Sequence, residues 1–273
     1  MTGKKLSRLA ALLAAFLPAA LLHADEPENA KIAAENFSPA AIVAIPRPAF
    51  KARADVPIAL ERRFRDDCSV SNAVGTTCSA AILSLRPTQF NLGMIEVRQR
   101  AKKMSRMSGH DLKEYMENTP APVVIGPGGA FFIFDRHHEA RALLEIGQDR
   151  MAAVVRADWQ DLSEDEFWRR MKSHHWVWLR DKGEGPLGPG DLPKNVLRMT
   201  DDPYRSLARA AVKKGGCRKS TVPFAEFLWA DFYRPRIPEL TIESDYHKAV
   251  EEAISLAHAP SAAQLPGYIP AKN

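Results

Sequence analysis

Residues 131–147, FFIFDRHHEARALLEIG, decide the fold of this chain. The apolar run 131–134 predicts a strand, and the residues after it have the spacing of an amphipathic helix with one stripe toward a core. That stripe, at i, i+3, i+4 and i+7, consists of Ala140, Leu143, Leu144 and Gly147. The charged residues between the two segments therefore lie where a strand ends and a helix begins.

The turn between strand and helix combines carboxylates, a guanidinium and two imidazoles. A helix N-terminus presents unpaired N–H groups and the positive end of the helix dipole, so it attracts an anion such as phosphate. We therefore predict a phosphate site at this turn, with His138 facing the ligand and its neighbour partly packed. The predicted catalytic groups are Asp135, His137 and His138, and the predicted substrate contacts are Arg136 and Glu139.

Three functions remain open for this turn. The first is phosphodiester hydrolysis, as in a nuclease or phosphodiesterase, and the second is non-catalytic binding of a phosphate-bearing or acidic partner. In the third, Asp135 caps the helix and the histidines couple the core to the rest of the chain, so that His138→Ala would lower thermal stability. The cofactor is unknown. A divalent metal on Asp135 and one histidine is a further alternative, although two adjacent ligands do not form a cage.

Charge and leader composition place the chain outside the strongly basic class of nucleic-acid coat proteins. The chain has 273 residues, with 38 Lys+Arg against 33 Asp+Glu. Residues 1–24 combine a basic start with the apolar run 9–22 and a small residue at Ala24, which predicts a signal peptide and a periplasmic or secreted bacterial protein. The leader holds three of the five net positive charges, which leaves about +2 on the mature chain.

The three cysteines fit an oxidising compartment only in part. Cys68 and Cys78 bracket a short polar stretch that a disulfide could close. Cys217 is left over in a basic turn, where we interpret it as a bystander thiol rather than a nucleophile.

The predicted fold is α+β, a small β-sheet flanked by helices with a C-terminal helical extension. Predicted strands cover 82–85, 122–125, 131–134, 151–157 and 176–179, with a Gly/Pro turn at 126–129 and a loop at 183–193. Predicted helices begin at Gly93, His110, His137, Ser163, Asp202 and Thr221, and the last runs from Glu243 to His258. The predicted parts are the signal peptide 1–24, an N-terminal arm 25–80, the core 81–180, the helical extension 181–258 and a disordered tail 259–273.

Several separate motifs, in order along the chain, resemble the ParB-like nuclease family of the ParB/sulfiredoxin superfamily. Besides the strand–DRHHE–helix unit, these are Leu85–Gln89 followed by Gly93 and Val97, Asp158-Trp159, Asp202–Ala208, and Glu226-Phe227 with Trp229–Phe232. The resemblance covers about residues 82–236. It implies a sulfiredoxin-like sheet, a phosphate site at the strand–helix turn and nucleic acid as a partner class, although fold does not settle function.

Three further side chains in these motifs are predicted substrate contacts. Thr88 and Gln89 belong to the opening segment of the resemblance, and Arg205 is a cation near a helix start, where the helix dipole disfavours it unless it reaches a carboxylate or a bound anion. The remaining acids, Asp202, Glu226 and Asp231, are expected to serve as caps and ion-pair partners. The pair His174-His175 is expected to end a helix.

The sequence also departs from the family pattern at the turn. Arg136 replaces the glycine, and Glu139 the second arginine, of ParB-type relatives. A glutamate at 139 would repel a triphosphate, which weighs against the usual nucleotide clamp. Sulfiredoxin chemistry requires a cysteine in the turn, and none is present.

Overall fold

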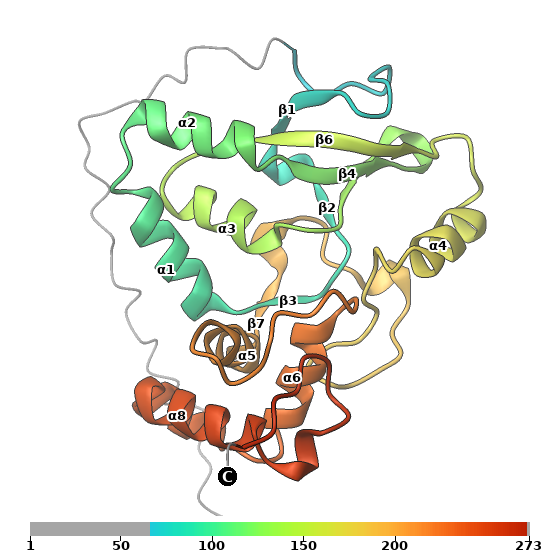
Figure 1. The fold of residues 1–273 in the computed structure, drawn as a ribbon. Coiled ribbons are helices and arrows are strands. Elements are labelled where there is room, and N and C mark those ends of the chain that lie inside the picture. The colour runs from blue at the N-terminus through green and yellow to red at the C-terminus, as the bar shows by residue number, and fades with distance from the viewer. Residues whose placement is uncertain (1–65, 272–273) are drawn as a thin grey trace, which may run out of the picture. The chain divides into compact units, whose positions relative to one another are not determined.

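The computed structural model describes residues 66–271, and these form a mixed α+β fold in which helices flank a small sheet (Figure 1). The predicted signal peptide and most of the predicted arm lie outside the described residues. Within the described part, no helix is both long enough and apolar enough to span a bilayer.

A five-stranded sheet with the order β1-β6-β4-β5-β2 forms the core. Its strands are β1 (Thr77–Ala81), β2 (Arg86–Pro87), β4 (Ala121–Ile125), β5 (Phe131–Ile133) and β6 (Arg150–Asp158). Strand β4 pairs parallel with β6 and antiparallel with β5, and the β4–β5 connection confirms the predicted Gly/Pro turn. Positive φ angles of 67° and 74° at Gly128 and Gly129 explain why that turn needs glycine.

Alternation along the strands separates two apolar layers. Val123 and Ile133 face one layer, which is covered by α1 (Met94–Met104), α2 (Gly109–Asn118) and α3 (His137–Glu145). Their neighbours Val124 and Phe132 face the other layer, where α4 (Glu164–Ser173) packs through Phe167 and Met171. Helix α3 therefore lies on one face of the sheet and α4 on the other.

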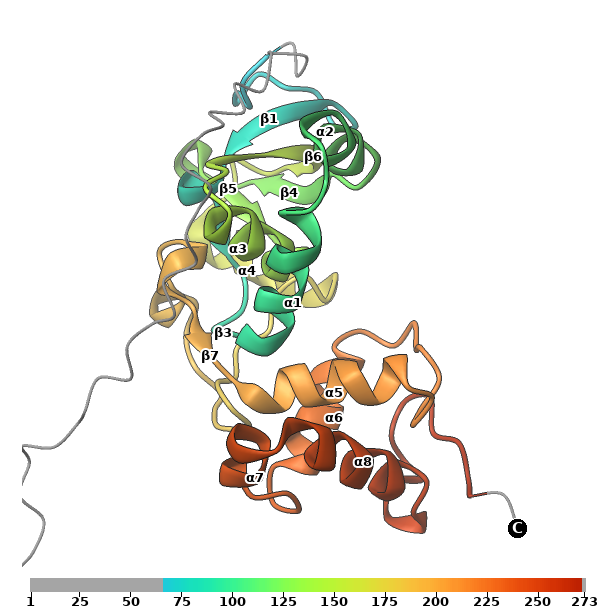
Figure 2. The ribbon, with the colours of Figure 1, turned by 90° about the vertical axis from the view of Figure 1, so that its left-hand side faces the viewer.

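The helical extension joins the core through a short two-stranded sheet. Strand β3 (Asn91–Leu92) pairs parallel with β7 (Thr200–Asp201), and α5 (Pro203–Lys213) follows directly. Helix α5 contacts α1 on one side and α6 (Ala225–Tyr233), α7 (Glu239–Ser244) and α8 (Tyr246–Ala257) on the other (Figure 2). Leu207, Trp229 and Tyr233 are fully buried in this second core.

Four sequence predictions about elements need correction. Residues 82–84 form a 3₁₀ helix, while β1 precedes them and completes the sheet edge. Residues 176–179 form no strand: Trp176 N donates back to Met171 O of α4 and Trp178 N to Thr88 O, both at 2.9 Å, so their amides do not follow one neighbouring strand. Helix α6 begins at Ala225 rather than at Thr221, after Phe224 with φ 59°. The last predicted helix is broken at Asp245, whose side chain caps α8.

The chain after residue 258 is packed over 259–271, which corrects the predicted disordered tail. The indole Nε1 of the buried Trp229 donates to Pro266 O at 2.8 Å, and Arg218 N donates to Gly267 O at 2.8 Å. A Cβ at Gly267 would lie 2.2 Å from Arg218 O, so glycine permits this close approach. The buried indole of Trp229 thus obtains its hydrogen-bond partner from the tail.

The cysteines divide as the sequence suggests. Cys68 and Cys78 form a disulfide that links the start of the described chain to β1. Cys217 is free and buried, and burial raises the pKa of its thiol to about 11. A buried, protonated thiol is a poor nucleophile, in agreement with its interpretation as a bystander.

Candidate functional site

Two adjacent imidazoles at the start of α3 hold the two ends of the segment 88–93, which connects β2 to α1. His137 Nε2 accepts a hydrogen bond from Thr88 N at 3.3 Å, and His138 Nε2 accepts one from Gly93 N at 3.0 Å. Each ring must be neutral at Nε2 to accept a proton in this way. In the structure, both histidines act as acceptors for backbone amides.

Burial keeps these imidazoles neutral. His137 is 3% exposed, and burial, opposed by Asp135 and by a backbone hydrogen bond to Ile133, lowers its pKa to about 4. Burial also lowers the pKa of His138 well below its usual value, and the guanidinium of Arg205 contributes to the lowering at both rings. The two rings therefore remain uncharged at neutral pH.

Gly93 connects the histidine pair at the start of α3 to the helical extension. A Cβ at this position would lie 2.3 Å from Ser206 Oγ and 2.6 Å from Ser206 N in α5. Ser206 Oγ in turn accepts a hydrogen bond from Glu96 N at 3.1 Å. His138, Gly93 and Ser206 thus form a continuous contact between α3, α1 and α5, which matches the coupling role that the sequence left open for the histidine pair.

A buried carboxylate continues this contact. Glu96 is 4% exposed and forms an ion pair with Arg100 at 2.7 Å. Arg209 Nε of α5 lies 3.6 Å from the same carboxylate, and Arg209 Nη1 also bonds Glu226 of α6 at 3.0 Å. His138 Nε2 lies 3.7 Å from Glu96 Oε2. Two cations from two helices compensate the buried charge of Glu96.

The predicted substrate contacts Arg136 and Glu139 pair with each other. Glu139 is 5% exposed, and its carboxylate accepts hydrogen bonds from Arg136 Nη1 at 2.8 Å and from the hydroxyl of Tyr115. Burial and that bond raise the pKa of Tyr115 to about 12. Arg100 Nη1 also lies 3.8 Å from Glu139 Oε1. The negative charge of Glu139 is therefore compensated within the protein and is not open to a ligand.

Thr88 and Gln89 are likewise engaged within the protein. Thr88 Oγ1 donates to Ile133 O at 3.1 Å, and Gln89 Nε2 donates to Asn91 O at 3.0 Å. Asn91 Nδ2 donates to Asp181 Oδ1 at 3.1 Å, while its buried Oδ1 has no hydrogen-bond partner among the described residues. The segment 88–93 is therefore a buried polar strap over the start of α3.

Arg205 differs from the other arginines of this cluster, Arg100, Arg136 and Arg209, which all form ion pairs. It is 95% buried, and its guanidinium carbon lies 3.4 Å from the centroid of the Phe227 ring. Its Nε and Nη1 have no hydrogen-bond partner, and no carboxylate forms an ion pair with it in the described part. Burial lowers its pKa, while Glu226 and Asp202 oppose the lowering. A buried guanidinium with two free donor atoms is costly unless an anion reaches it.

The start of α3 also has donors without acceptors. The N–H groups of residues 137–139 donate to no side chain or loop oxygen in the part that the structure describes. Asp135 does not cap the helix, because its Oδ1 accepts from Arg136 N at 2.7 Å, and its side chain is exposed. Of the three predicted catalytic residues, Asp135 is therefore the most exposed to solvent.

The remaining acids and the second histidine pair have the structural roles that the sequence suggests. Asp202 caps α5 and pairs with Arg234 at 2.7 Å, and Asp231 lies 3.8 Å from the same arginine. His174 ends α4. Residues 66–271 contain no group of three or more His, Cys, Asp or Glu side chains that could hold a metal ion.

Comparison with known proteins agrees with this architecture. A family model described as Putative ParB-like nuclease matches residues 78–235. The chain belongs to this family. It is also similar to a crystal structure of protein Atu1540 from Agrobacterium tumefaciens, with 33% sequence identity and a TM-score of 0.68 over 74% of this chain and 100% of that chain. A search of curated proteins gives no match. The predicted family and the predicted fold are both confirmed, and membership supports a nuclease-like role.

The family pattern at the turn has a backbone reason. Arg136, where ParB-type relatives carry glycine, has φ 65° in the left-handed region that glycine adopts without strain. In this conformation the Arg136 guanidinium pairs with Glu139 at 2.8 Å. The two departures from the pattern are therefore in direct contact.

Sequence reasoning placed the turn correctly but missed Glu96, Asn91 and Ser206. Glu96 reads as an ordinary helix residue, and no local pattern shows that two arginines will surround it. The one available signal was glycine at 93, directly before a helix, where glycine often marks a close backbone approach. The catalytic roles of Asp135, His137 and His138 stay predictions.

Proposed function

We propose that this protein binds a phosphate group of a nucleic acid between Arg205 and the N-terminus of α3. The observation that carries this proposal is the 95% buried Arg205 guanidinium, whose Nε and Nη1 lack partners. The next residue, Ser206, packs against Gly93, whose amide donates to His138 Nε2 at the start of α3, so Arg205 belongs to the part of α5 that covers this turn. In agreement, Arg205 lowers the pKa of both His137 and His138. A phosphate oxygen would satisfy the free guanidinium donors and the free amides of α3 together.

The charges of Asp135 and Arg205 favour a single phosphate group over a triphosphate at this position. The exposed carboxylate of Asp135 lies at the same turn and would repel additional negative charge. A phosphodiester carries a single negative charge, which Arg205 alone can neutralise. The family's nuclease description points to nucleic acid as the source of that phosphodiester.

The decisive experiment compares Arg205→Met with the wild type. Methionine retains the stem that packs on Phe227 but removes the charge, so affinity for a short single-stranded oligonucleotide and for inorganic phosphate should fall at least about 10-fold. Stability should stay constant or rise, because the variant no longer buries an unpaired charge. Arg98→Met, an exposed cation on α1, is the matched control and should change neither quantity. Equal affinity of Arg205→Met and wild type would exclude the site.

Hydrolysis is the second candidate, favoured by the exposed carboxylate of Asp135 beside the proposed phosphate. Asp135 could orient an attacking water, while Arg205 and the α3 amides stabilise the developing charge. The imidazoles are less suited to this chemistry, since both Nε2 atoms already accept amide protons. Turnover of an oligonucleotide with and without Mg²⁺, lost in Asp135→Asn but with binding retained, would support cleavage. Binding without turnover under both conditions would leave only the binding function.

We also propose that the protein is exported to the periplasm or secreted. The supporting observations are the leader-like composition of residues 1–24 and the Cys68–Cys78 disulfide, since disulfides persist mainly in oxidising compartments. Fractionation of expressing cells should recover a chain that begins after residue 24, with these two thiols protected from alkylation. A full-length cytoplasmic chain with both thiols reactive would contradict export.

A further inference from the structure

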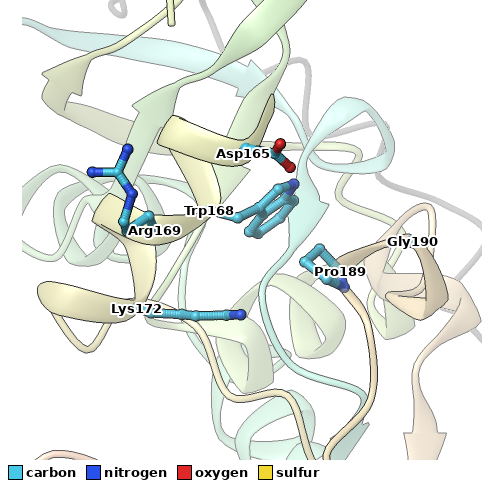
Figure 3. Close-up of a pocket in the computed structure, with 6 residues that line it drawn as sticks. All are labelled: Asp165, Trp168, Arg169, Lys172, Pro189 and Gly190. Atoms are coloured by element: carbon cyan, nitrogen blue, oxygen red, sulfur yellow. The ribbon is translucent and has the colours of Figure 1, made fainter. Parts of the chain in front are cut away.

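A cleft separates α4 from the Gly/Pro loop on the face of the sheet opposite α3. It measures about 460 Å³ and is lined by Asp165, Trp168, Arg169 and Lys172 of α4 and by Pro189 and Gly190 of the loop (Figure 3). This volume falls within the range of about 300–1,000 Å³ that is usual for small-molecule sites. None of these residues takes part in the contacts around Arg205.

Trp168 offers a fixed flat surface to this cleft. Its Nε1 donates to Glu164 Oε2 at 3.1 Å, and its ring packs edge-on against Phe132 and Phe167, with centroids 5.3 and 4.9 Å away. Pro189 lies across the cleft from the indole (Figure 3). An indole whose N–H is already bonded, facing a proline ring, presents two apolar walls suited to a planar guest.

The charged groups of the cleft lie at opposite ends of the indole. Asp165 lies at one end and Lys172 at the other, and both side chains are exposed (Figure 3). Neither forms an ion pair with another residue in 66–271, whereas Arg169 pairs with Glu166. A guest that fits must therefore be flat, with a hydrogen-bond donor at one end and a negative charge at the other.

We infer that this cleft binds one unpaired nucleotide, with its base between Trp168 and Pro189 and its phosphate at Lys172. The exocyclic amine of a base such as cytosine then donates to Asp165. The base must be unpaired, because a paired and stacked base has no free faces to offer. The inference rests on the proposed function only in taking a nucleic-acid strand as the source of the nucleotide.

The test measures binding of fluorescein-labelled 12-residue oligo(dC) and oligo(dT) by anisotropy, using the full chain at 50 mM salt. Trp168→Leu retains apolar packing but loses the flat surface, so oligo(dC) affinity should fall about 10-fold. Trp168→Phe should stay near the wild type, and Lys172→Gln should lose about 3-fold. Lys103→Gln, on the exposed side of α1, is the matched control and should change nothing.

Asp165 provides a base-specific readout. The wild type should prefer oligo(dC) to oligo(dT), and Asp165→Ala should remove that preference. Unchanged oligo(dC) affinity in both Lys172→Gln and Trp168→Leu would overturn the inference. If Trp168→Leu fails to fold, unchanged oligo(dC) affinity in Lys172→Gln together with no preference of the wild type for oligo(dC) would overturn it.

Two further arms separate the cleft from the Arg205 site. Loss of binding in Trp168→Leu with normal binding in Arg205→Met would support the cleft while contradicting the proposed function. The reverse result would overturn the cleft alone. Competition by dCMP at an equal concentration of nucleotide would support the cleft and identify free nucleotides as its ligand, whereas competition only by strands would support the form proposed here.

Discussion

The chain contains two pairs of consecutive histidines, each at the end of a helix, and the two pairs differ in their exposure to solvent. His137 and His138 begin α3 and accept hydrogen bonds from the amides of Thr88 and Gly93. His137 is buried, and the side chain of His138 is only 13% exposed. His174 ends α4 and is exposed, with Nδ1 3.0 Å from Arg170 O and its ring 4.7 Å from that of Trp176.

The difference shows that the interactions of a His-His dipeptide depend on the segments that pack over it. At α3, the segment 88–93 and α5 close over the rings, so both become uncharged acceptors inside a polar interior. At α4, both rings are exposed, and the imidazole of His174 packs at an angle against the rings of Trp176 and Trp159. A sequence motif of two histidines therefore carries no fixed function by itself.

Acid should affect the buried pair strongly. In the unfolded chain, histidine takes up a proton near pH 6.5, whereas His137 does so only near pH 4 when folded, and the pKa of His138 is also depressed. The unfolded state thus binds more protons below pH 6.5, and stability falls as pH falls toward 4. We expect His137 alone to lose about 2 kcal/mol between pH 6.5 and 4.5, on the order of 1 kcal/mol per pH unit, and His138 to add a loss of the same sign.

Urea unfolding at several pH values measures this slope. His137→Gln should reduce it by about 1 kcal/mol per pH unit. His174→Gln, which replaces an exposed ring, is the matched control. An equal slope in all three proteins would refute the contrast between the two pairs.

Gly93→Ala should disrupt the packing of segment 88–93 against α5, which covers the histidine pair of α3 and has no counterpart at the pair of α4. The new Cβ would meet Ser206 N and Oγ at 2.6 and 2.3 Å, so α5 must move away from α1. Overpacking against backbone should cost about 3 kcal/mol in the free energy of unfolding, measured by chemical denaturation. Gly190→Ala is the control, because no atom lies within 4 Å of its added Cβ, and it should cost little. A near-neutral Gly93→Ala would show that the junction is loose.

His138→Ala and His174→Ala compare the pairs directly. The first leaves the amide of Gly93 without an acceptor and opens a cavity, so we expect a loss of about 2 kcal/mol. The second removes an exposed ring and should cost less than about 1 kcal/mol. Thermal or urea unfolding at pH 7.5 gives both values. Similar losses would mean that burial does not separate the two pairs.

The smallest effect concerns the backbone of the exposed pair. His175 has φ 55°, a conformation that favours glycine, and its side chain is exposed. His175→Gly should therefore raise stability by about 1 kcal/mol, whereas His175→Ala should not. If both substitutions had the same effect on the melting temperature, backbone strain would not be its cause.

The sequence by itself determined much of the local structure. Periodicity at 140–144, the cap residues Ser163 and Asp202, and the Gly/Pro turn at 126–129 each act over a few residues, and the structure confirms them. Gly147, predicted to lie on the same apolar stripe, is instead exposed and follows the end of α3 at Glu145, with a positive φ of 81°. The ordered motifs also determined the family, because they reach from the sheet into the extension.

Only the tertiary structure decided which charges are buried and what compensates them. Glu96 meets Arg209 across 113 positions of chain, and Gly93 meets Ser206 across the same junction, so no local pattern could reveal either contact. The unpaired state of Arg205 is likewise a property of its surroundings. Helix starts and turns follow from short-range sterics and hydrogen bonds, whereas the state of a buried charge depends on every group that packs around it.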